Sequence, residues 1–232
     1  MNSAPALGCT MLLLRHGEIT QAAPTRFVGQ RDLPLTPRGR AQALAWSALF
    51  SRLPLAGAWC SDLARCRDTA ALALTETSIA PTALPALREI HLGGWEGLTK
   101  DEVRQRFPGE FEQRGRDLAN GIPSGGESFA QAQQRFLEAL RHISTQASAQ
   151  AGGQTGGQAG GQAGGLVLVV AHGGVIRAAL CRTLGLRLDS LLRLGQDYCG
   201  LNILHTTPHG ATELHAMNLA PGDAEGMLKE MS

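Results

Sequence analysis

The sequence predicts an α/β protein, a three-layer α/β/α sandwich whose central sheet is mostly parallel and has an antiparallel edge strand. Short apolar runs alternate along the chain with segments whose apolar residues recur at helical spacing. This alternation is typical of a parallel sheet covered on both faces by helices. Two runs, residues 12–14 and 166–171, end next to a histidine and a glycine. The length of 232 residues suits one core of this kind, so we expect a single domain over residues 1–232.

Local signals locate the elements. The predicted strands are residues 12–14, 57–61, 166–171, 201–206 and 211–217. The predicted helices are residues 37–49, 63–75, 99–107, 128–146 and 175–180. Thr36, followed by a proline, is a good cap for the first helix. Ser61 or Asp62 is expected to cap the second helix, and Thr99 with Glu102 forms a capping box for the third.

Two segments are predicted to lack regular structure. Residues 152–165 repeat glycine and glutamine with no apolar face to bury, which predicts a flexible loop. Lengthening such a loop costs only about 0.6 kcal/mol per doubling, so a tolerated expansion is favoured over a partner-binding role. The polar tail at residues 221–232 is expected to be loose.

Composition excludes several classes of protein. Hydrophobic residues make up 43% of the chain and charged residues 18%, as in an ordinary globular protein. The net charge of +1 argues against a nucleic-acid partner, and no apolar run reaches membrane-spanning length. The five scattered cysteines are expected to be reduced, packed thiols, which indicates a cytoplasmic protein.

The first apolar run ends in Arg15, His16 and Gly17, three residue types that suit phosphate chemistry. An arginine fork holds a phosphate through two parallel hydrogen bonds. A neutral imidazole attacks phosphorus near physiological pH. A glycine allows the backbone to approach an anion closely.

The run at residues 166–171 repeats this design, because it ends in His172 and Gly173 and a helical pattern follows. Two parallel strands of this kind would bring both histidines to one crevice. Arg65, in the first turn of the helix at residues 63–75, is expected to point toward the same crevice. Glu89 supplies a carboxyl group from a glycine-rich loop, and Glu96 in that loop is the alternative acid.

These residues occur in an ordered set that resembles the histidine phosphatases, the superfamily that includes the cofactor-dependent phosphoglycerate mutases. The set consists of Arg15-His16-Gly17-Glu18, Arg26-Phe27-Val28-Gly29-Gln30, Pro34-Leu35-Thr36-Pro37-Arg38-Gly39, Ser61-Asp62-Leu63 with Arg65, Glu89 with Gly94-Trp95-Glu96-Gly97, and His172-Gly173-Gly174. The resemblance extends from Leu12 to about His205. Residues 123–128 and the loop at Glu89 look most like the α-ribazole phosphatases and their broad-specificity relatives.

The resemblance implies roles for these side chains. His16 would accept the phosphoryl group and form a phosphohistidine, which water then hydrolyses. The phosphoryl oxygens would be surrounded by Arg15, Arg65 and His172. Glu89 would protonate the leaving alcohol and later activate water. The expected substrate-binding residues are Gly17, Arg26 and Gly173, and Arg26 is equally well interpreted as a surface charge. No metal and no cofactor is expected, because arginines and histidines already supply positive charge.

The sequence also departs from many of the proteins it resembles. Ile19 and Ala22 occupy positions where those proteins have a hydroxyl residue and an asparagine. This difference and the short segment between Gly97 and Glu127 favour a hydrolase over a mutase. The expected partner is a small phosphorylated metabolite, with α-ribazole 5'-phosphate as one candidate. A phosphoglycerate mutase and a non-catalytic phospho-ligand or protein-binding module are the alternatives, and a homodimer is compatible with the sequence.

Overall fold

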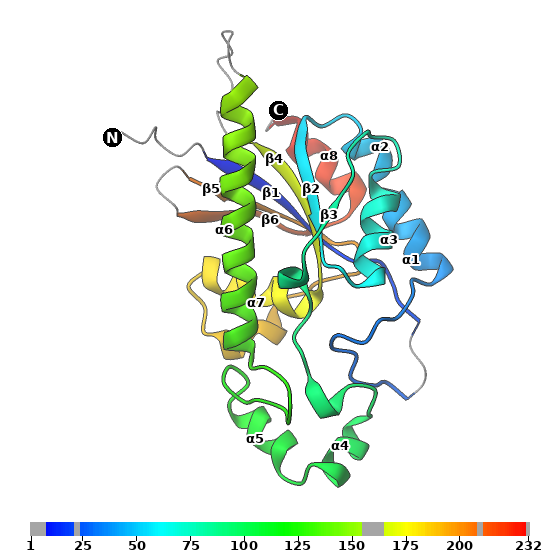
Figure 1. Cartoon of the computed structure of the whole chain (residues 1–232), viewed down its shortest axis with the longest axis vertical. Helices are drawn as coiled ribbons and strands as arrows, with labels where there is room; N and C mark the ends of the chain where they lie inside the picture. The colour runs from blue at the N-terminus through cyan, green and yellow to red at the C-terminus, as the bar shows by residue number, and fades with distance from the viewer. Residues whose placement is uncertain (1–7, 21–23, 155–164, 208–210, 231–232) are drawn as a thin grey trace.

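A computed structural model describes residues 8–20, 24–154, 165–207 and 211–230 (Figure 1). Its centre is a six-stranded sheet with the order β3-β2-β4-β1-β5-β6. The strands are β1 (Cys9–Arg15), β2 (Leu55–Cys60), β3 (Thr82–Ala83), β4 (Leu166–Ala171), β5 (Leu201–Thr206) and β6 (Thr212–Leu219). The first four pair in parallel, and β5 runs antiparallel to both β1 and β6. The mixed, mostly parallel sheet with an antiparallel pair at one edge is therefore confirmed.

Helices cover both faces of the sheet (Figure 1). They are α1 (Pro37–Leu44), α2 (Ser47–Phe50), α3 (Ala64–Ala73), α4 (Lys100–Arg106), α5 (Glu110–Arg116), α6 (Phe129–Gln154), α7 (Gly173–Thr183) and α8 (Pro221–Glu230), with short 3₁₀ turns at Pro85–Leu87, Gly93–Trp95 and Leu188–Arg193. Helices α6 and α7 lie on one face and α1, α2, α3 and α8 on the other, while α4 and α5 lie beyond one end of the sheet. Within the described part of the chain, no helix is both long and apolar enough to span a bilayer.

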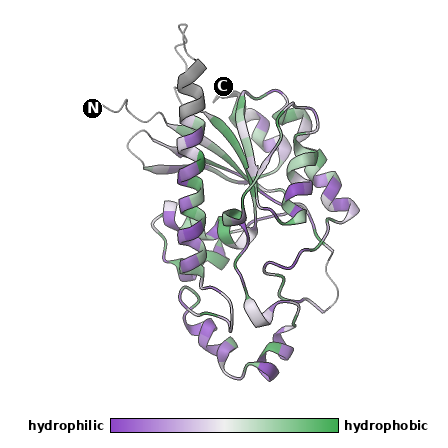
Figure 2. Ribbon diagram, viewed as in Figure 1, coloured by the Kyte–Doolittle hydropathy of each residue, from purple (hydrophilic) through white to green (hydrophobic). Residues whose placement is uncertain are grey.

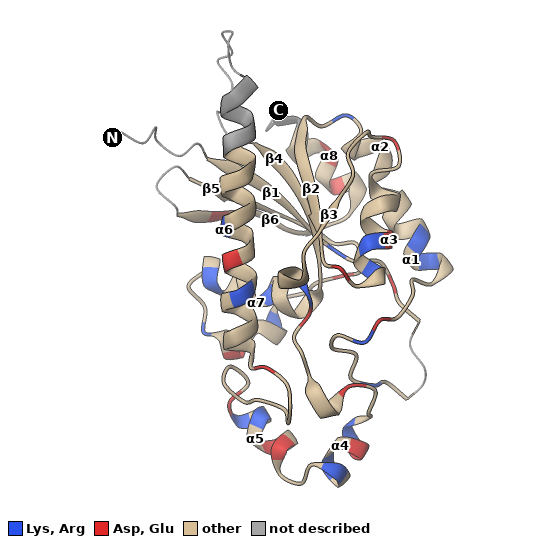
Figure 3. Ribbon diagram, viewed as in Figure 1, with Lys and Arg blue, Asp and Glu red and all other residues tan. Residues whose placement is uncertain are grey.

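Alternation along the central strands fills both layers of the core. Met11 and Leu13 of β1 join the cluster packed against α6 and α7, and Leu12 and Leu14 join the cluster on the opposite face. Residues of β4 divide in the same way, since successive side chains of a strand point to opposite faces. Figure 2 shows the sheet as the most hydrophobic region, and Figure 3 shows charges of both signs on α4 and α5. Burial on both faces explains why these runs are continuously apolar.

The expectation of a loose tail is wrong for most of its length, because residues Pro221–Glu230 form α8. Ala224 and Leu228 are four residues apart, lie on the same side of this helix and are 0% and 2% exposed. The proline at its first position suits a helix start. Both side chains belong to the hydrophobic cluster on this face of the sheet, although the average composition of the helix is polar. Residues 231–232 lie outside the described residues.

Other boundaries also differ from the predictions. Helix α6 continues through residue 154, so residues 152–154 are helical, and the rest of the predicted loop lies largely outside the described residues. The helix predicted at residues 37–49 is divided into α1 and α2. Trp46 lies between the two helices, is fully buried and donates a hydrogen bond to the Cys199 carbonyl at 3.1 Å.

The expected cap of α3 is wrong as well. Helix α3 has Leu63 at its N-cap position without a side-chain cap bond. The amide of Ala64 donates instead to Asp32 Oδ1 at 2.7 Å, from a loop distant in sequence. The carboxylate of Asp62 instead forms an ion pair with Arg88, at 2.6 Å. By contrast, the Thr36 cap and the capping box of Thr99 with Glu102 are confirmed.

The buried position of Leu228 gives a direct test of α8. Leu228→Ala should lower the free energy of unfolding by about 2–4 kcal/mol, because it removes buried methyl groups next to the sheet. Met227→Ala, at the half-buried neighbouring position, is the control and should have a smaller effect. Urea unfolding followed by circular dichroism measures both variants. Equal, negligible effects would show that α8 does not contribute to the core.

Candidate active site

The pairing of β1 with β4 brings two histidines together. Arg15 and Ala171 are register partners at the carboxyl ends of these parallel strands, and His16 and His172 follow them directly. The amide of His16 donates to the Ala171 carbonyl at 3.0 Å and extends the ladder by one bond. The two rings lie 5.2 Å apart in an edge-to-face arrangement and are almost completely buried. The structure thus places both predicted histidines in one site.

Hydrogen bonding defines the protonation of His16. Its Nδ1 lies 2.8 Å from the Gly17 carbonyl oxygen. Because a carbonyl can only accept, Nδ1 carries the proton and Nε2 keeps its lone pair. Burial, reinforced by the charges of Arg65 and Arg15, holds the pKa of His16 well below its ordinary value. At neutral pH the ring is therefore an uncharged imidazole with a free nitrogen.

Arg65 is buried in contact with the second histidine. Its Nε donates to His172 Nδ1 at 3.1 Å, so the ring proton of His172 resides on Nε2. The two other nitrogens of its guanidinium donate to the carbonyls of Gly29 and Arg31 at 2.9 and 2.7 Å. Burial, followed by the charge of Arg65, also holds the pKa of His172 well below its ordinary value. The Cys66 sulfur lies 3.4 Å from Nε2, and burial raises the pKa of this thiol, which stays neutral.

Arg15 approaches the site from the end of β1. One guanidinium nitrogen donates to the Gln196 carbonyl, and the guanidinium carbon lies 4.0 Å from the centre of the Tyr198 ring. Gln196 is itself fixed by a reciprocal amide pair with Asn202, at 2.8 and 2.9 Å. The Nε of Arg15 is buried and has no hydrogen-bond partner. This unsatisfied donor could bind an anionic ligand without losing an existing hydrogen bond.

The hydrogen-bond partners of the two site arginines are uncharged groups. Among the described residues, neither Arg15 nor Arg65 forms an ion pair with a carboxylate within 4.0 Å; their partners are carbonyl oxygens, a histidine nitrogen and an aromatic ring. A buried cation without a counter-ion is energetically unfavourable unless an anion completes its environment. The electrostatics therefore favour a dianionic ligand such as a phosphomonoester.

The two candidate carboxylates have different surroundings. Glu89 accepts hydrogen bonds from the amides of Gly174 and Val175 at 2.8 and 3.1 Å, so it lies at the start of α7 beside His172. Glu96 instead accepts from the amides of Gln30 and Leu92 at 2.9 and 3.0 Å and holds its own loop. The geometry places Glu89 with the arginines and histidines, and its role as the acid stays a prediction.

The structure explains why two positions of the site, Gly17 and Gly173, are glycines. A Cβ on Gly17 would lie 2.4 Å from the Gly39 carbonyl oxygen, and the Gly17 amide already donates to Thr69 Oγ1 at 3.0 Å. A close crossing of two backbones therefore accounts for the glycine at position 17, and an anion contact by Gly17 stays a prediction. A Cβ on Gly173 would lie 3.1 Å from Arg15 Nε and 3.0 Å from Arg177 Nη1. Gly173 thus allows two guanidinium groups to approach the start of α7.

The hydrogen bonds of Arg26 go to residues outside the cluster of histidines and arginines. Its guanidinium donates to Glu102 at 2.8 Å and to the Gly97 carbonyl at 2.8 Å. These bonds tie its loop to the start of α4. They favour a structural role, and an anion contact by Arg26 stays a prediction.

The residues that carry this geometry match a known family. The family model of the histidine phosphatase superfamily (branch 1) matches residues 11–219. The chain belongs to the histidine phosphatase superfamily. A glucosyl-3-phosphoglycerate phosphatase of Mycolicibacterium vanbaalenii is 38% identical to it, over 80% of this chain and 78% of the relative. A 2,3-bisphosphoglycerate-dependent phosphoglycerate mutase of Gloeobacter violaceus is 32% identical, over 82% of each. An adenosylcobalamin/alpha-ribazole phosphatase of Escherichia coli is 26% identical, over 80% of this chain and 84% of the relative.

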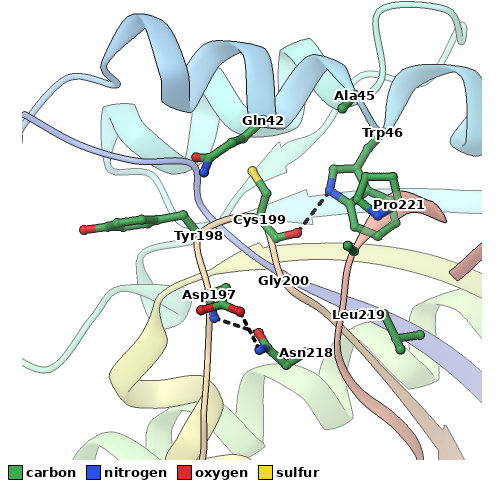
Figure 4. A pocket seen from close by; sticks show the side chains of 11 residues that line it. Gln42, Ala45, Trp46, Asp197, Tyr198, Cys199, Gly200, Asn218, Leu219 and Pro221 are labelled. Atoms are coloured by element: carbon green, nitrogen blue, oxygen red, sulfur yellow. Dashed lines mark hydrogen bonds between the residues drawn. The ribbon is translucent and has the colours of Figure 1, made fainter. Parts of the chain in front are cut away.

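Tyr198 also borders this site, and no motif of the sequence singles it out. Tyr198 covers Arg15, and its ring lies 5.7 Å from that of His16. It also lines a pocket of about 270 Å³ with Gln42 and Trp46 (Figure 4). None of the catalytic candidates lines this pocket, so it does not mark the phosphoryl position. In the described ranges, no group of three or more His, Cys, Asp or Glu side chains is placed to hold a metal ion.

The depressed pKa values of the two buried histidines make stability depend on pH. Below about pH 6.5 both rings take up protons in the unfolded chain but not in the folded protein, so acid favours unfolding. From about pH 7.5 to about pH 5.5 the free energy of unfolding should fall by about 2–3 kcal/mol, half of it from each ring. Urea titrations in phosphate-free buffer measure this change. His16→Gln should remove about half of the dependence, whereas His142→Gln, on the exposed face of α6, should leave it unchanged.

Thr69 connects the two arginine-bearing segments. Its hydroxyl accepts from the Gly17 amide at 3.0 Å and donates to the Arg65 carbonyl at 2.7 Å, fully buried. Thr69→Val keeps the shape and leaves the buried Gly17 amide without its hydrogen-bond partner, so we expect a loss of about 1–3 kcal/mol of stability. Thr69→Ser, which keeps the hydroxyl, should retain most of the stability of the wild type. Thermal unfolding of the two variants measures the difference, and equal stabilities would contradict this role.

Proposed function

We propose that the protein is a phosphomonoester hydrolase that acts through a phosphohistidine intermediate on a small phosphorylated metabolite. The state of His16 carries the proposal: its ring is neutral, its Nδ1 is occupied by the Gly17 carbonyl, and its Nε2 is free. The charges of Arg65 and Arg15 act on this ring, and in the described part of the chain neither arginine has a carboxylate partner within 4.0 Å. A nucleophile of this kind beside unneutralised cations is suited to attack a phosphoryl dianion.

The reaction has two steps. In the first, His16 Nε2 forms a bond to phosphorus while the bond from phosphorus to the alcohol oxygen breaks, and Glu89 donates a proton to that oxygen. In the second, Glu89 takes a proton from water, whose oxygen attacks phosphorus and displaces the imidazole. Arg15, Arg65 and His172 stabilise the equatorial oxygens in both transition states.

A mutase-type phosphoryl transfer is the second candidate, because a phosphoglycerate mutase is among the relatives. The chain itself favours hydrolysis. Ile19 is 5% exposed and forms a bridge with Leu35, so an apolar side chain occupies the position at which the resemblance calls for a hydroxyl. Ala22 lies outside the described residues. A non-catalytic binding module would be expected to have lost the nucleophile or the acid, and both residues are present.

The proposal also covers the setting in which the enzyme works. All five cysteines are free and buried, as expected for a protein of a reducing compartment, and we propose a cytoplasmic location. The sequence is compatible with a homodimer, and the expectation of no nucleic-acid partner stays a prediction. The names of the relatives make phosphoglycerate derivatives and α-ribazole 5'-phosphate the substrates to try first.

Phosphate release by the purified protein tests the function. The substrates are p-nitrophenyl phosphate, α-ribazole 5'-phosphate, phosphoserine, 3-phosphoglycerate and glucosyl-3-phosphoglycerate, each with and without EDTA. We expect release that EDTA does not inhibit and that His16→Ala lowers by about 10³-fold or more, because the nucleophile is lost. His142→Ala, a remote surface histidine, is the control and should be as active as the wild type. Two results would contradict the proposal: full activity of His16→Ala, or loss of the wild-type activity when EDTA is added.

A further inference from the structure

The loop that carries Glu89 is held by an arginine from outside the site. Arg135, in the second turn of α6, donates from Nη1 to the carbonyls of Ala86 and Arg88 at 2.8 and 3.0 Å. Its Nη2 reaches the carbonyl of Glu89 itself at 3.4 Å. One guanidinium therefore binds three backbone oxygens within four successive residues. Such a contact fixes the path of the main chain, whichever way the side chains point.

Glu127 orients this arginine and binds the other end of the loop. Its Oε1 accepts from Arg135 Nη2 at 2.6 Å and from the amide of His91 at 2.9 Å. Its Oε2 accepts from Arg135 Nε at 3.4 Å, and its own amide donates to the His91 carbonyl at 2.9 Å. The two side chains are 26% and 19% exposed. The pair thus binds the backbone on both sides of Glu89 in a largely buried setting.

The carboxylate of Glu89 completes a connection from α6 to α7. It accepts from the amides of Gly174 and Val175, which directly follow His172 and Gly173. Among the described residues, Arg135 and Glu127 form no hydrogen bond with His16, His172 or the Glu89 carboxylate. Apart from the charge of Arg135, which acts through space on His172, the influence of this pair on proton transfer passes through the backbone at Glu89. Two other contacts on this loop, Arg88 with Asp62 and Gln30 with the Glu89 carbonyl at 2.9 Å, secure it from the opposite side.

We propose that the ion pair of Arg135 and Glu127 is a positioning device for the proton-transfer step, which sets the distance between the Glu89 carboxylate and the leaving oxygen. This inference rests on the proposed phosphatase function. Both side chains bind the backbone of the Glu89 loop and act through it, so both are positioning residues rather than catalytic ones. Proton transfer depends steeply on geometry, and small displacements of the carboxylate should lower its rate.

Leaving groups of different quality separate this role from general damage to the site. A nitrophenolate departs from phosphorus as an anion and needs little help from an acid. The alkoxide of an alkyl phosphate needs the proton from Glu89. Loss of positioning should therefore slow the hydrolysis of alkyl phosphates much more than that of p-nitrophenyl phosphate. Damage to His16 or the arginines would slow both substrates together.

Arg135→Lys and Glu127→Gln are the test variants. Arg135 also contributes, as the last of several charges, to the low pKa of His172. The lysine keeps that charge and removes the fork that binds three carbonyls. Arg141→Lys, on an exposed position of the same helix, is the matched control.

For the best alkyl substrate of the panel, kcat/KM should fall about 10–100-fold in both variants. For p-nitrophenyl phosphate it should fall by less than about 3-fold. In a Glu89→Gln background, Arg135→Lys should have no further effect on the alkyl substrate, because the group it positions is already gone. Equal losses for the two substrates, or no loss for either, would overturn the proposal.

Amide hydrogen exchange gives a readout that does not depend on activity. The amides of Gly174 and Val175 contact Glu89 but not Arg135. In Arg135→Lys they should exchange faster than in the wild type, whereas the amide of Ile176, bonded to the His172 carbonyl within α7, should be unchanged. Unchanged exchange at Gly174 and Val175 would overturn the positioning role even if the wild type hydrolysed no substrate. An inactive wild type with faster exchange would instead contradict only the proposed function.

Discussion

The parallel pairing of β1 with β4 is the interaction on which the site depends. Its register makes Arg15 and Ala171 partners, so His16 and His172 emerge side by side at the carboxyl edge of the sheet. A shift of one residue would turn every side chain of the strand to the other face and would separate the rings. The strands are apolar on both faces and held between two helical layers, which makes such a shift unfavourable. The core therefore specifies the active-site geometry as well as the stability.

Around these rings the protein concentrates positive charge without neutralising it. The partners of Arg65 are the carbonyls of Gly29 and Arg31 and a neutral histidine, and those of Arg15 are a carbonyl and the Tyr198 ring. Carbonyl dipoles orient a guanidinium while leaving its net charge available to a ligand. The same charges, together with burial, keep both histidines unprotonated. One arrangement thus prepares the nucleophile and the binding site for its substrate.

How much of the fold and of the site the sequence predicts depends on how far apart in the chain the interacting residues lie. Strands, helix starts and the side-by-side histidines follow from local patterns, as Thr36 and the residues after β1 and β4 illustrate. The cap of α3 comes from Asp32, thirty-two residues away, and no local signal at Ser61 or Asp62 reveals it. Helix α8 is difficult to predict because, among its described side chains, Ala224 and Leu228 alone are buried. Arg135 looks like one more charge on an amphipathic helix until the fold brings the Glu89 loop beside it.

The position of Glu89 adds a constraint of its own. Its carboxylate accepts three backbone N–H groups, from Ile90, Gly174 and Val175, and so occupies amides at the start of α7 that would otherwise suit an anion. The phosphoryl group must then be bound by the guanidinium groups and not by these amides. A carboxylate held this way donates nothing, and it becomes an acid only after taking up a proton. The loop must therefore keep Glu89 within reach of the leaving oxygen for both of its proposed roles, as acid in the first step and as base in the second.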